Sequence, residues 1–579
     1  MMMHARSFDS GRSSRPHTAT NAMFVREIAV VGPGTIGMPV AALLANAELW
    51  APDGTPTRVT VVQRASTSSG WKVGAINAGR SPIGALEPAL DELVAQGAGS
   101  GRLRATTEYR DIRDADAIIV CVQSERRGMG PEYVALFDAL HGVADALTQR
   151  TADARPLVVI ESTLAPSSML TEVRALFSAH GLEEGRDILL ANSPGRSVSG
   201  QAVESVRGHD KLIGALSPST ARQVAAIYSR FVRGSLHCTN SMTAEIVKTL
   251  ENAVRDVRIA YAAEVARYCD AQDLDYYALR ERVNSRLTKD GAAPSPLGEL
   301  LVPTVGVGGR GLPKDGVLLW WRALEAGENP AHSLVLEARR INDESPAQLL
   351  GLVERVSGAV RGRSIALLGV AYRPDSSDAR CSPTLVLARH LLDRGAQVSL
   401  HDPHVGAADP HLLQSGLASH FHRDPADALA TAEVVVVCVA HREYLDGGER
   451  WLPHAQRLRT VVDACNAYRA SQIATPAIRY GGLGRGIRKP SGAHVDAVIA
   501  GLQAVMQGVA NEAARLVDLL NERYVHDAFS TVDLDEVRRL ATTGRMGCTI
   551  GAKGPVPAVR PFDAFASRLV ACAVGAPKH

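Results

Sequence analysis

Aromatic residues are scarce in this chain, and its cysteines form no paired motif. Phe, Trp and Tyr make up 4% of the 579 residues, too few for the stacking platforms that bind single-stranded nucleic acid. The eight cysteines contain no C-x-x-C pair, so the sequence indicates neither a zinc site nor a dithiol, and we expect no metal centre. Several lie in apolar runs, which is typical of reduced core thiols and indicates a cytoplasmic protein.

Excess charge and long apolar runs are lacking too. The formal net charge is +2, which gives no reason to expect a nucleic acid or an anionic membrane as partner. No apolar run reaches the roughly 18 residues of a membrane-spanning helix. The first residues are rich in Ser, Arg and His without the apolar segment of a signal peptide, so we expect 1–23 to be a disordered tail.

A glycine-rich turn follows the first strand-like segment. Glu27–Val31 is a short apolar run, and the pattern G-x-G-x-x-G comes directly after it, before an apolar helix-like stretch. In such a turn the first glycine permits the bend, the second lets backbone N–H groups approach a pyrophosphate, and the third lets helix and strand pack closely. The start of the helix favours an anion there. The predicted cofactor contacts in this turn are Gly32, Gly34, Thr35, Ile36 and Gly37.

The second strand-like segment, Arg58–Val62, ends without an acidic residue. Sites for NAD usually place Asp or Glu at this point to bind the ribose hydroxyls, and this chain has Gln63 and Arg64. An amide still bonds a hydroxyl, whereas a guanidinium tolerates a 2′-phosphate. We therefore expect NAD as the cofactor and leave NADP open.

Two further buried strands end in polar residues. Ala117–Val122 leads into Gln123, and Pro156–Ile160 leads into Glu-Ser-Thr163. Residues at this position lie at the carboxyl edge of a parallel sheet, where ligands bind in such folds. Gln123 and Thr163 are therefore candidate cofactor contacts, although Thr163 is equally well placed to be a helix N-cap.

A long helical pattern without Gly or Pro occupies the middle of the chain, over Thr243–Arg267. Lys248 and Asn252 are four residues apart and share one face of it. Apolar neighbours would bury them partly, and such a lysine can hold a developing oxyanion; the alternative is a solvated polar stripe. A long helix between two α/β units is also a natural surface for a homodimer.

A second glycine-rich stretch, Pro303–Asp315, carries four glycines among its first nine positions. Glycine loses too much backbone entropy to form a helix or strand interior. We therefore expect a loop that bends sharply or approaches a ligand closely. It ends in Lys314 and Asp315, which places charges beside bare backbone.

A second set of apolar strands, between Arg363 and Asn466, lacks a G-x-G-x-x-G turn and should bind something other than a whole dinucleotide. Arg373 and Arg380 are natural phosphate partners there, although either alone fits a surface charge. The sequence predicts an α/β fold with two Rossmann-like, doubly wound parallel sheets joined by a long central helix, plus a partly helical C-terminal extension. The expected units after the tail are 24–235, 236–345, 346–487 and 488–579.

Five segments, in order over roughly residues 24–487, resemble motifs of the UDP-glucose/GDP-mannose dehydrogenase family. Beside the dinucleotide turn, Glu161-Ser-Thr163-Leu-Ala-Pro is similar to its S-T-V-x-P segment, and the helix with Lys248 and Asn252 to its K-x-x-x-N helix. Two loops complete the resemblance: Val307-Gly-Gly-Arg-Gly-Leu-Pro-Lys-Asp315 resembles G-G-H/S-C-x-P-x-D, and Tyr372-Arg-Pro-Asp-Ser-Ser-Asp-Ala-Arg380-Cys-Ser-Pro resembles Y-K-P-x-x-x-D-x-R-x-S-P.

The resemblance implies oxidation of the C6 alcohol of a UDP-sugar to a carboxylate, in two hydride transfers to NAD. Lys248 and Asn252 would hold the C6 oxygen, while Asp315 and a water ordered by Thr163 would handle protons. The remaining implied contacts are Lys211 and Gly308 with the substrate, Arg373 with its diphosphate, and Arg380 with the cofactor. A homodimer through the central helix and a role in polysaccharide biosynthesis are implied as well.

Two departures from the family pattern bear on the chemistry. Gly311 stands where the family has its nucleophilic cysteine, with Arg310 before it, and the P-E-x segment reads Ser-Pro194-Gly195-Arg196. The cysteine forms the thiohemiacetal from which the second hydride leaves, so we expect oxidation to stop or slow at the aldehyde. An epimerase-type reaction and a non-catalytic nucleotide-sugar-binding role are the alternatives. The sequence does not name the sugar, although residues 193–200 and 210–214 look closer to the N-acetylmannosamine branch.

Overall fold

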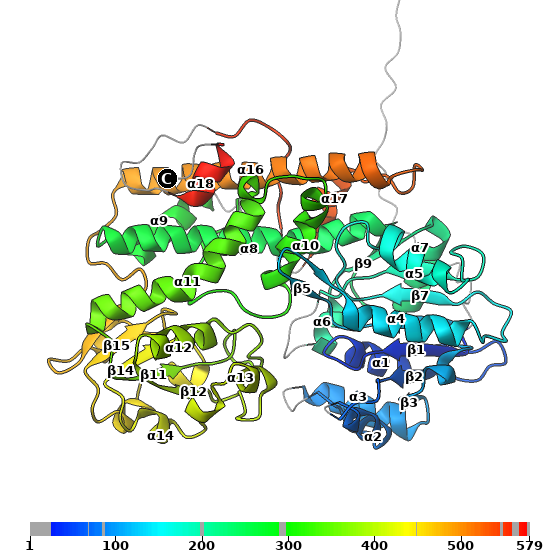
Figure 1. The fold of residues 1–579 in the computed structure, drawn as a ribbon, viewed down its shortest axis with the longest axis horizontal. Helices are drawn as coiled ribbons and strands as arrows, with labels where there is room; N and C mark the ends of the chain where they lie inside the picture. The colour runs from blue at the N-terminus through cyan, green and yellow to red at the C-terminus, as the bar shows by residue number, and fades with distance from the viewer. Residues whose placement is uncertain are drawn as a thin grey trace, which may run out of the picture.

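The computed structural model describes residues 25–67, 69–83, 87–196, 202–288, 297–446, 448–544, 548–557 and 567–575. Two α/β units lie side by side under a layer of long helices that spans both (Figure 1). The expected tail, 1–23, lies outside the described residues. The two parallel sheets, the central helix and the C-terminal helices confirm the predicted fold class.

The first unit is built on an eight-stranded sheet. Its strands are parallel except for the β8–β9 pair, which is antiparallel. In spatial order they are β10 (Leu236–Asn240), β9 (Lys211–Ala215), β8 (Leu189–Asn192), β7 (Leu157–Ile160), β4 (Ala117–Val120), β1 (Glu27–Val31), β2 (Arg58–Val62) and β3 (Leu103–Thr106).

Both faces of this sheet are apolar because helices cover both. In β1, Ile28 and Val30 belong to one core cluster, whereas Ala29 and Val31 belong to another. A strand buried on both sides reads as a continuous apolar run, as β1 does. One core includes residues of α1 (Gly37–Ala45), α3 (Pro88–Gly99), α6 (Ala202–Gly208) and α7 (Pro218–Tyr228); the other includes residues of α4 (Val134–Leu147) and α5 (Arg174–Ala179), which continues a π-turn, η2 (Met169–Val173).

Smaller elements complete this unit. A two-stranded antiparallel ribbon leaves the carboxyl end of β4 and contacts α10. The elements are α2 (Trp71–Asn77), η1 (Tyr109–Ile112) and the ribbon strands β5 (Glu125–Arg127) and β6 (Gly130–Glu132).

The second unit is a six-stranded sheet in which every pair is parallel. Its spatial order is β13 (Phe421–His422), β12 (Gln397–His401), β11 (Ser364–Leu368), β14 (Val434–Val437), β15 (Thr460–Asp463) and β16 (Arg479–Gly482). Its helical elements are α12 (Pro383–Asp393), α13 (Pro410–Gln414), η4 (Ala418–His420), α14 (Pro425–Leu429), η5 (Arg442–Tyr444), η6 (Leu452–His454) and α15 (Ala470–Ile473).

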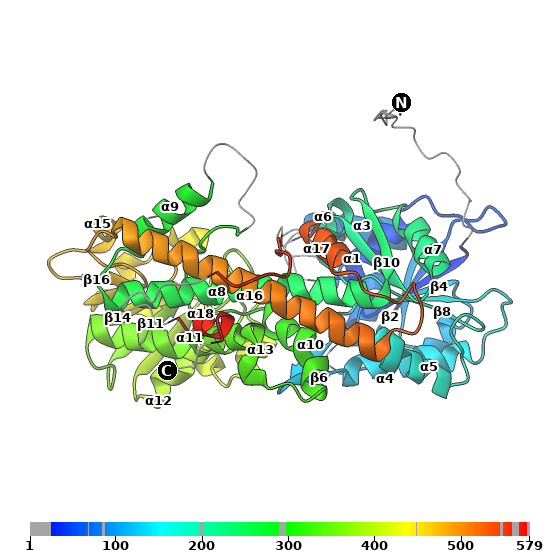
Figure 2. The same cartoon turned by 90° about the horizontal axis from the view of Figure 1, so that it is seen from above.

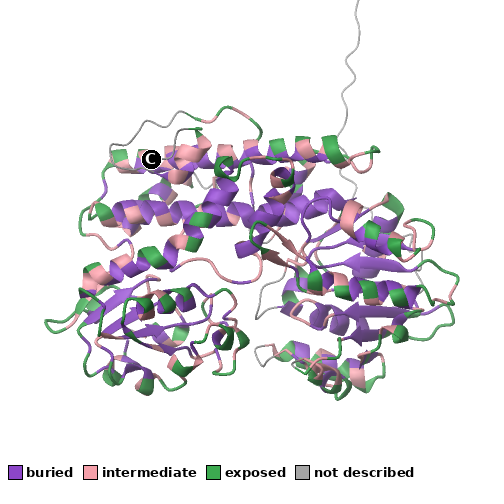
Figure 3. Cartoon of the chain, viewed as in Figure 1, coloured by how far each residue is buried: buried purple, intermediate pink, exposed green. Residues whose placement is uncertain are grey.

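The central helix α8 (Ser241–Ala271) belongs to the helical layer and runs across both units (Figure 1). Asn240 caps its N-terminus by accepting from the Thr243 N–H at 2.7 Å. Every residue of α8 is described, and Ala271 alone is exposed (Figure 3). Its closest partners are α10 (Leu312–Glu325) and α11 (Leu334–Ser357), with α9 (Tyr276–Leu287) and η3 (Pro330–His332) beside them.

The C-terminal extension covers the side of α8 away from the sheets. Its main element, α16 (Gly492–Tyr524), lies lengthwise over the central helices, as the view from above shows (Figure 2). The sequence pattern did not indicate two short helices here: α17 (Leu534–Thr542) packs against α8, and α18 (Arg568–Ala573) packs against α16 and α11. The chain's own helices thus cover α8 on this side, and the homodimer through the central helix stays a prediction.

Among the described residues, no helix is both long enough and apolar enough to cross a membrane.

Glu512 of α16 connects the extension to the start of α11. Its buried carboxylate accepts from the Ser333 hydroxyl and from the N–H groups of Leu334, at 2.8 Å, and Val335, at 3.4 Å. We expect Glu512→Ala to lower the free energy of unfolding by about 1–3 kcal/mol, because it leaves buried helix N-terminal donors unpaired. Urea denaturation measures this, and a loss of under about 0.5 kcal/mol would contradict the role.

The same carboxyl should make stability depend on pH. Burial raises the pKa of Glu512 to about 7, so between its unfolded value near 4.5 and pH 7 the folded state holds a proton that the unfolded state releases. The stability that the Glu512 carboxyl contributes through this proton is therefore fully present below pH 4.5, and it is lost as the pH rises through about 7. Glu512→Gln cannot titrate, so its stability should fall less than the wild type's across this window; parallel curves would contradict the assignment.

Candidate active site

Asp315 lies fully buried between two lysines at the start of α10. Lys248 Nζ lies 3.4 Å from Asp315 Oδ2, and Lys314 Nζ lies 3.1 Å from Oδ1. Asn252 donates its side-chain amide to Oδ2. The side chain of Asp315 is 0% exposed and that of Lys248 is 11% exposed. Two ammonium groups thus pair with one carboxylate in a nearly dry site. These three groups together have a formal excess of one positive charge.

Two helices bring these groups together. Lys248 and Asn252 are one turn apart on α8, and both are buried, so the prediction of a solvated stripe is wrong. Asp315 lies in the first turn of α10, and Pro313 lies in the same turn. A carboxylate at that position is stabilised by the helix dipole. We call Lys248, Asn252, Lys314 and Asp315 the lysine–aspartate cluster.

Gly311 borders this cluster directly. A Cβ placed on Gly311 would lie 2.6 Å from Asn252 Nδ2 and 3.5 Å from Asp315 Oδ2. The backbone of Gly311, with φ of −102°, accepts any residue. A side chain at this position would therefore point into the cluster, and the end of Asn252 occupies the space it would need.

The glycine loop before α10 approaches the second sheet domain closely. A Cβ on Gly308 would lie 2.6 Å from Tyr372 Cβ and 2.8 Å from the Cys381 carbonyl. The Gly309 N–H donates to the Arg380 carbonyl at 2.9 Å. The close approach that the sequence predicted is therefore made, among the described residues, to the loop that carries Arg373 and Arg380, so the glycines have a packing reason. That loop lies between β11 and α12.

Arg310 joins the two α/β units across the loop. Its guanidinium donates to the Thr35 hydroxyl in the first glycine turn and lies 3.5 Å from Asp378 in the second unit. Its Nε is buried without a hydrogen-bond partner in the described structure. The Lys72 ammonium donates to the Pro33 carbonyl of the turn at 3.4 Å, and burial and then the charge of Arg310 lower the pKa of Lys72. Positive charge therefore gathers beside the turn.

The first glycine turn suits a dinucleotide phosphate. Gly32 has φ of +92°, a conformation that favours glycine. A Cβ on Gly37 would lie 2.2 Å from the Gly32 carbonyl, whereas one on Gly34 would have no atom within 4 Å. The turn thus has its close helix–strand packing at Gly37 and open space at Gly34, where the backbone can approach an anion. Ile36 stands at the N-cap of α1.

The carboxyl ends of β4 and β7 meet near the cluster, as predicted. Ser124 donates to the Thr163 carbonyl at 2.6 Å, and Lys314 Nζ lies 3.4 Å from Ser124 Oγ. Gln123, between β4 and Ser124, is exposed. After β2, Gln63 bonds the Arg64 carbonyl at 3.2 Å and Ser69 at 3.0 Å, while Arg64 is exposed.

Lys211 forms a buried ion pair in the first unit. It begins β9, and its ammonium donates to Glu161 at 2.6 Å, while Tyr228 donates to the other oxygen of the same carboxylate. It lines a small cavity that also includes Ile36 and Arg196. The structure therefore places Lys211 beside the dinucleotide turn, and the predicted substrate contact would require its pair with Glu161 to open.

A second buried ion pair adjoins the cluster, and the sequence did not reveal it. Arg196 lies 2.8 Å from Glu251, whose neighbour in the chain is Asn252, and Arg196 also donates to Thr543 at 3.2 Å. Burial raises the pKa of Glu251 to about 7, against the opposing charges of Arg196 and Lys248. Arg196 belongs to the segment that lacks the glutamate of the P-E-x pattern, and Glu251 of α8 places a buried carboxylate beside it. Only the adjacency of Glu251 to Asn252 could have indicated it.

The two arginines expected to bind phosphate are both on the 371–381 loop. Arg373 is half-buried, and Arg380 donates its Nε to His411 at 3.3 Å. Because the Arg380 carbonyl also accepts from Gly309, this loop holds both residues next to the glycine loop. The geometry keeps them together but does not by itself assign a ligand.

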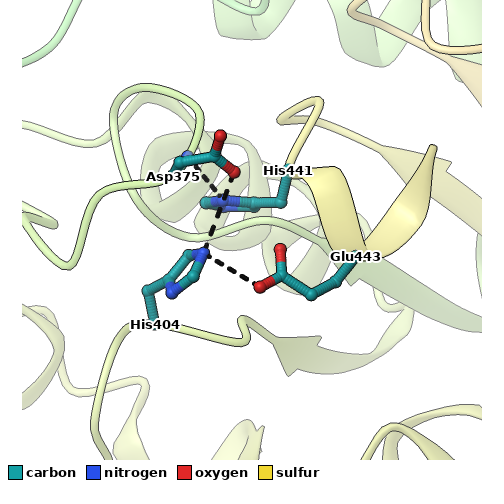
Figure 4. A group of neighbouring side chains, drawn as sticks. All are labelled: Asp375, His404, His441 and Glu443. Atoms are coloured by element: carbon teal, nitrogen blue, oxygen red, sulfur yellow. Dashed lines mark hydrogen bonds and ion pairs between the residues drawn. The ribbon is translucent and has the colours of Figure 1, made fainter.

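Asp375, His404, His441 and Glu443 form a tight group in the second unit (Figure 4). The Asp375 N–H donates to His441 Nδ1 at 3.0 Å, and His441 Nε2 lies 3.1 Å from Asp402. Both carboxylate oxygens of Asp375 accept from Arg442. Because His441 and Asp375 are already committed to these bonds, we interpret the group as a cross-link between loops rather than a metal site.

Comparison with known proteins identifies the family. Three models match in order: the NAD binding domain of the UDP-glucose/GDP-mannose dehydrogenase family over residues 26–232, its central domain over 242–344 and its UDP binding domain over 366–470. A UDP-N-acetyl-D-mannosamine dehydrogenase from Pyrococcus horikoshii is 29% identical over 79% of this chain and 99% of its own length. One from Yersinia pestis is 30% identical over 73% of this chain and 95% of its own length.

Solved structures agree with these sequence matches. The NDP-N-acetyl-D-galactosaminuronic acid dehydrogenase from Methanosarcina mazei superposes with a TM-score of 0.66 at 28% identity, over 80% of this chain and 96% of its own. The UDP-D-ManNAc dehydrogenase from Pyrococcus horikoshii gives 0.66 at 28% identity, over 79% and 99%. The chain is therefore an NAD-dependent oxidoreductase that belongs to the UDP-glucose/GDP-mannose dehydrogenase family.

Proposed function

We propose that this protein oxidises the C6 alcohol of a UDP-sugar with NAD and that the reaction stops, or slows strongly, at the aldehyde. The observation that carries the proposal is the lysine–aspartate cluster, with Gly311 directly beside it. The cluster is suited to alcohol oxidation, while the position next to it supplies no nucleophile for chemistry at the acyl level.

The charge balance of the cluster favours a developing alkoxide. Lys248 and Lys314 together carry one positive charge more than Asp315 neutralises, and the site is nearly dry, so the excess acts strongly on nearby charge. Lys248 and Asn252 would donate to the C6 oxygen, and Asp315 is the nearest carboxylate to accept the hydroxyl proton, with Thr163 in position to order a water. Bound NAD accepts the hydride that leaves C6.

The second oxidation needs a tetrahedral adduct at C6, from which a hydride can leave. A thiol at position 311 would form that adduct covalently. With Gly311, the adduct must come from addition of water to the aldehyde, and nothing at position 311 holds it. We therefore expect the aldehyde to leave the site, or to be oxidised slowly as its hydrate.

The cofactor would lie against the first glycine turn. Gly32, Gly34, Thr35, Ile36 and Gly37 form the phosphate-binding turn, with Gln63 and Arg64 near the adenosine end and Gln123, Thr163 and Arg380 further along. Arg310 would add a donor to the pyrophosphate, since its guanidinium contacts Thr35 and its buried Nε has no partner among the described residues. Arg310 would therefore add a charged donor to the backbone N–H groups of the turn.

The sugar nucleotide would lie between the glycine loop and the second unit. Arg373 would bind its diphosphate and Gly308 would border the sugar, since both belong to the two loops that meet there. The relatives named above act on N-acetylated sugar nucleotides, which supports a UDP-N-acetylhexosamine as substrate. All eight cysteines lie among the described residues as free thiols, which supports a cytoplasmic location.

The product distinguishes this proposal from its alternatives. Purified protein is incubated with NAD and a panel of UDP-hexoses and UDP-N-acetylhexosamines, with a hydroxylamine trap, and products are identified by mass spectrometry. We expect a trapped 6-aldehyde. A new epimer without net NADH would instead indicate the epimerase-type reaction, and binding without any product would indicate a non-catalytic protein.

Lys248→Met should lower kcat by about 10²–10³-fold, because it removes a donor to the developing alkoxide. NAD binding, followed by quenching of intrinsic fluorescence, should stay within about twofold because Lys248 is not part of the glycine turn. The matched control is Lys489→Met at an exposed lysine. Wild-type kcat in the Lys248 variant would rule out the proposed role of the cluster.

Gly311→Cys should restore oxidation to the carboxylate. The new thiol would point at Asn252 and Asp315, and the amide end of Asn252 must rotate to admit it. We expect the uronate share of product to rise in the cysteine variant and not in Gly311→Ala, which places a Cβ there without a nucleophile. Equal uronate from both variants would show that position 311 does not face the reacting carbon.

A further inference from the structure

Nearly the whole of α8 is buried by other parts of this one chain. Twenty-four of its 31 residues are buried, and residues along its whole length belong to one hydrophobic core. That core also contains residues of α10, α11, α16 and α17. The buried residues of α8 also include charged ones such as Glu245, Asp256 and Glu264, so α8 needs partners on every side that supply both apolar and polar contacts.

The extension supplies a large part of that burial. α16 presents Val498, Leu502, Val505 and Val509 to the same core. The Tyr261 hydroxyl of α8 donates to the Val498 carbonyl at 2.7 Å, and a Cβ on Gly501 would clash with that hydroxyl. The close crossing of α16 over α8 therefore depends on a glycine.

Buried polar contacts fix the extension in place at several points. Besides Glu512 at the start of α11, Glu264 of α8 accepts from Ser567 at 2.7 Å and from the Arg568 N–H at 2.7 Å. Arg568 in turn pairs with Glu337 and Glu344 of α11, each at 2.6 Å. Polar groups this well satisfied specify one docked position rather than a loose hydrophobic contact.

The extension also reaches the N-terminal end of α8, next to the active site. Asn240, the N-cap of α8, donates its side-chain amide to the Thr531 carbonyl at 3.0 Å, and a Cβ on Gly544 would meet the Glu251 carboxylate. Thr543 accepts from Arg196, the partner of Glu251. The extension thus covers α8 from end to end.

The relatives have no counterpart of this segment. The Pyrococcus protein matches over 99% of its own length while covering 79% of this chain, and the family model of the UDP binding domain ends at residue 470. A chain that ended there would expose the face of α8 that α16 and α17 cover here. Such an apolar face needs another partner, and a second copy of the chain presenting the same face is the simplest one.

We propose that the described residues of the C-terminal extension, in 488–544, 548–557 and 567–575, replace a second subunit: they occupy the surface of α8 through which two copies would otherwise associate, so the working form of this protein is a monomer. The inference rests on the packing of α8 and not on the proposed reaction, so either can fail without the other. The partner that fits α8 is this chain's own C-terminal segment.

Light scattering after size-exclusion chromatography tests this on the full-length protein. We expect the mass of one chain, 61.5 kDa, at loading concentrations from about 1 to about 100 µM, which span the Kd of ordinary dimers. A mass of two chains at these concentrations would overturn the proposal.

Gly501→Leu should lift α16 from α8, because its side chain would meet Tyr261. We expect a lower Tm, stronger binding of an apolar-surface dye, and a concentration-dependent rise in mass. Gln503→Leu, which places the same side chain at an exposed position of α16, is the control and should stay monomeric. A Gly501 variant with unchanged Tm, dye binding and mass would contradict the covering role; if that variant is insoluble, the wild-type mass decides.

Discussion

The buried carboxylate of Asp315 is the constraint on which the site depends. Taking Lys248, Lys314 and Asp315 out of water is costly unless they are paired, and removing one partner would leave an uncompensated buried charge. Asp315 holds both ammonium groups and the amide of Asn252 with its two oxygens. The result is a preorganised pair of ammonium donors with a formal excess of positive charge, which is the feature on which the proposed alcohol oxidation rests.

Two glycine stretches organise everything around that cluster, for different reasons. At Gly34 the backbone is open and can approach a phosphate, whereas Gly308 is required because Tyr372 and the Cys381 carbonyl leave no room for a Cβ. The second stretch therefore keeps the two α/β units in contact. Arg310, within the same stretch, donates to the Thr35 hydroxyl and so extends this contact to the first unit. This loop leads into α10, which carries Lys314 and Asp315, and it also keeps the two α/β units in contact.

Much of the fold was predictable because its signals are local. β1 and β2 are continuous apolar runs buried on both faces, so Glu27–Val31 and Arg58–Val62 were predicted with their observed bounds. The predicted helix over Thr243–Arg267 lies within α8, and the partly helical extension expected over 488–579 contains α16. What the sequence could not show is which surfaces meet. Nothing in residues 525–579 indicates α17 and α18, and the pairing of Arg196 with Glu251 depends on contacts between distant segments. For the same reason, the sequence did not reveal that α16 and α17 cover α8.

The central claim is that a site built for alcohol oxidation has lost the thiol needed for the second step. The most direct test is the ratio of NADH formed to sugar nucleotide consumed by the wild-type protein, measured at 340 nm and by chromatography in the same reaction. The account predicts one NADH per sugar during the first turnovers. A ratio of two, with uronate as the product, would contradict it.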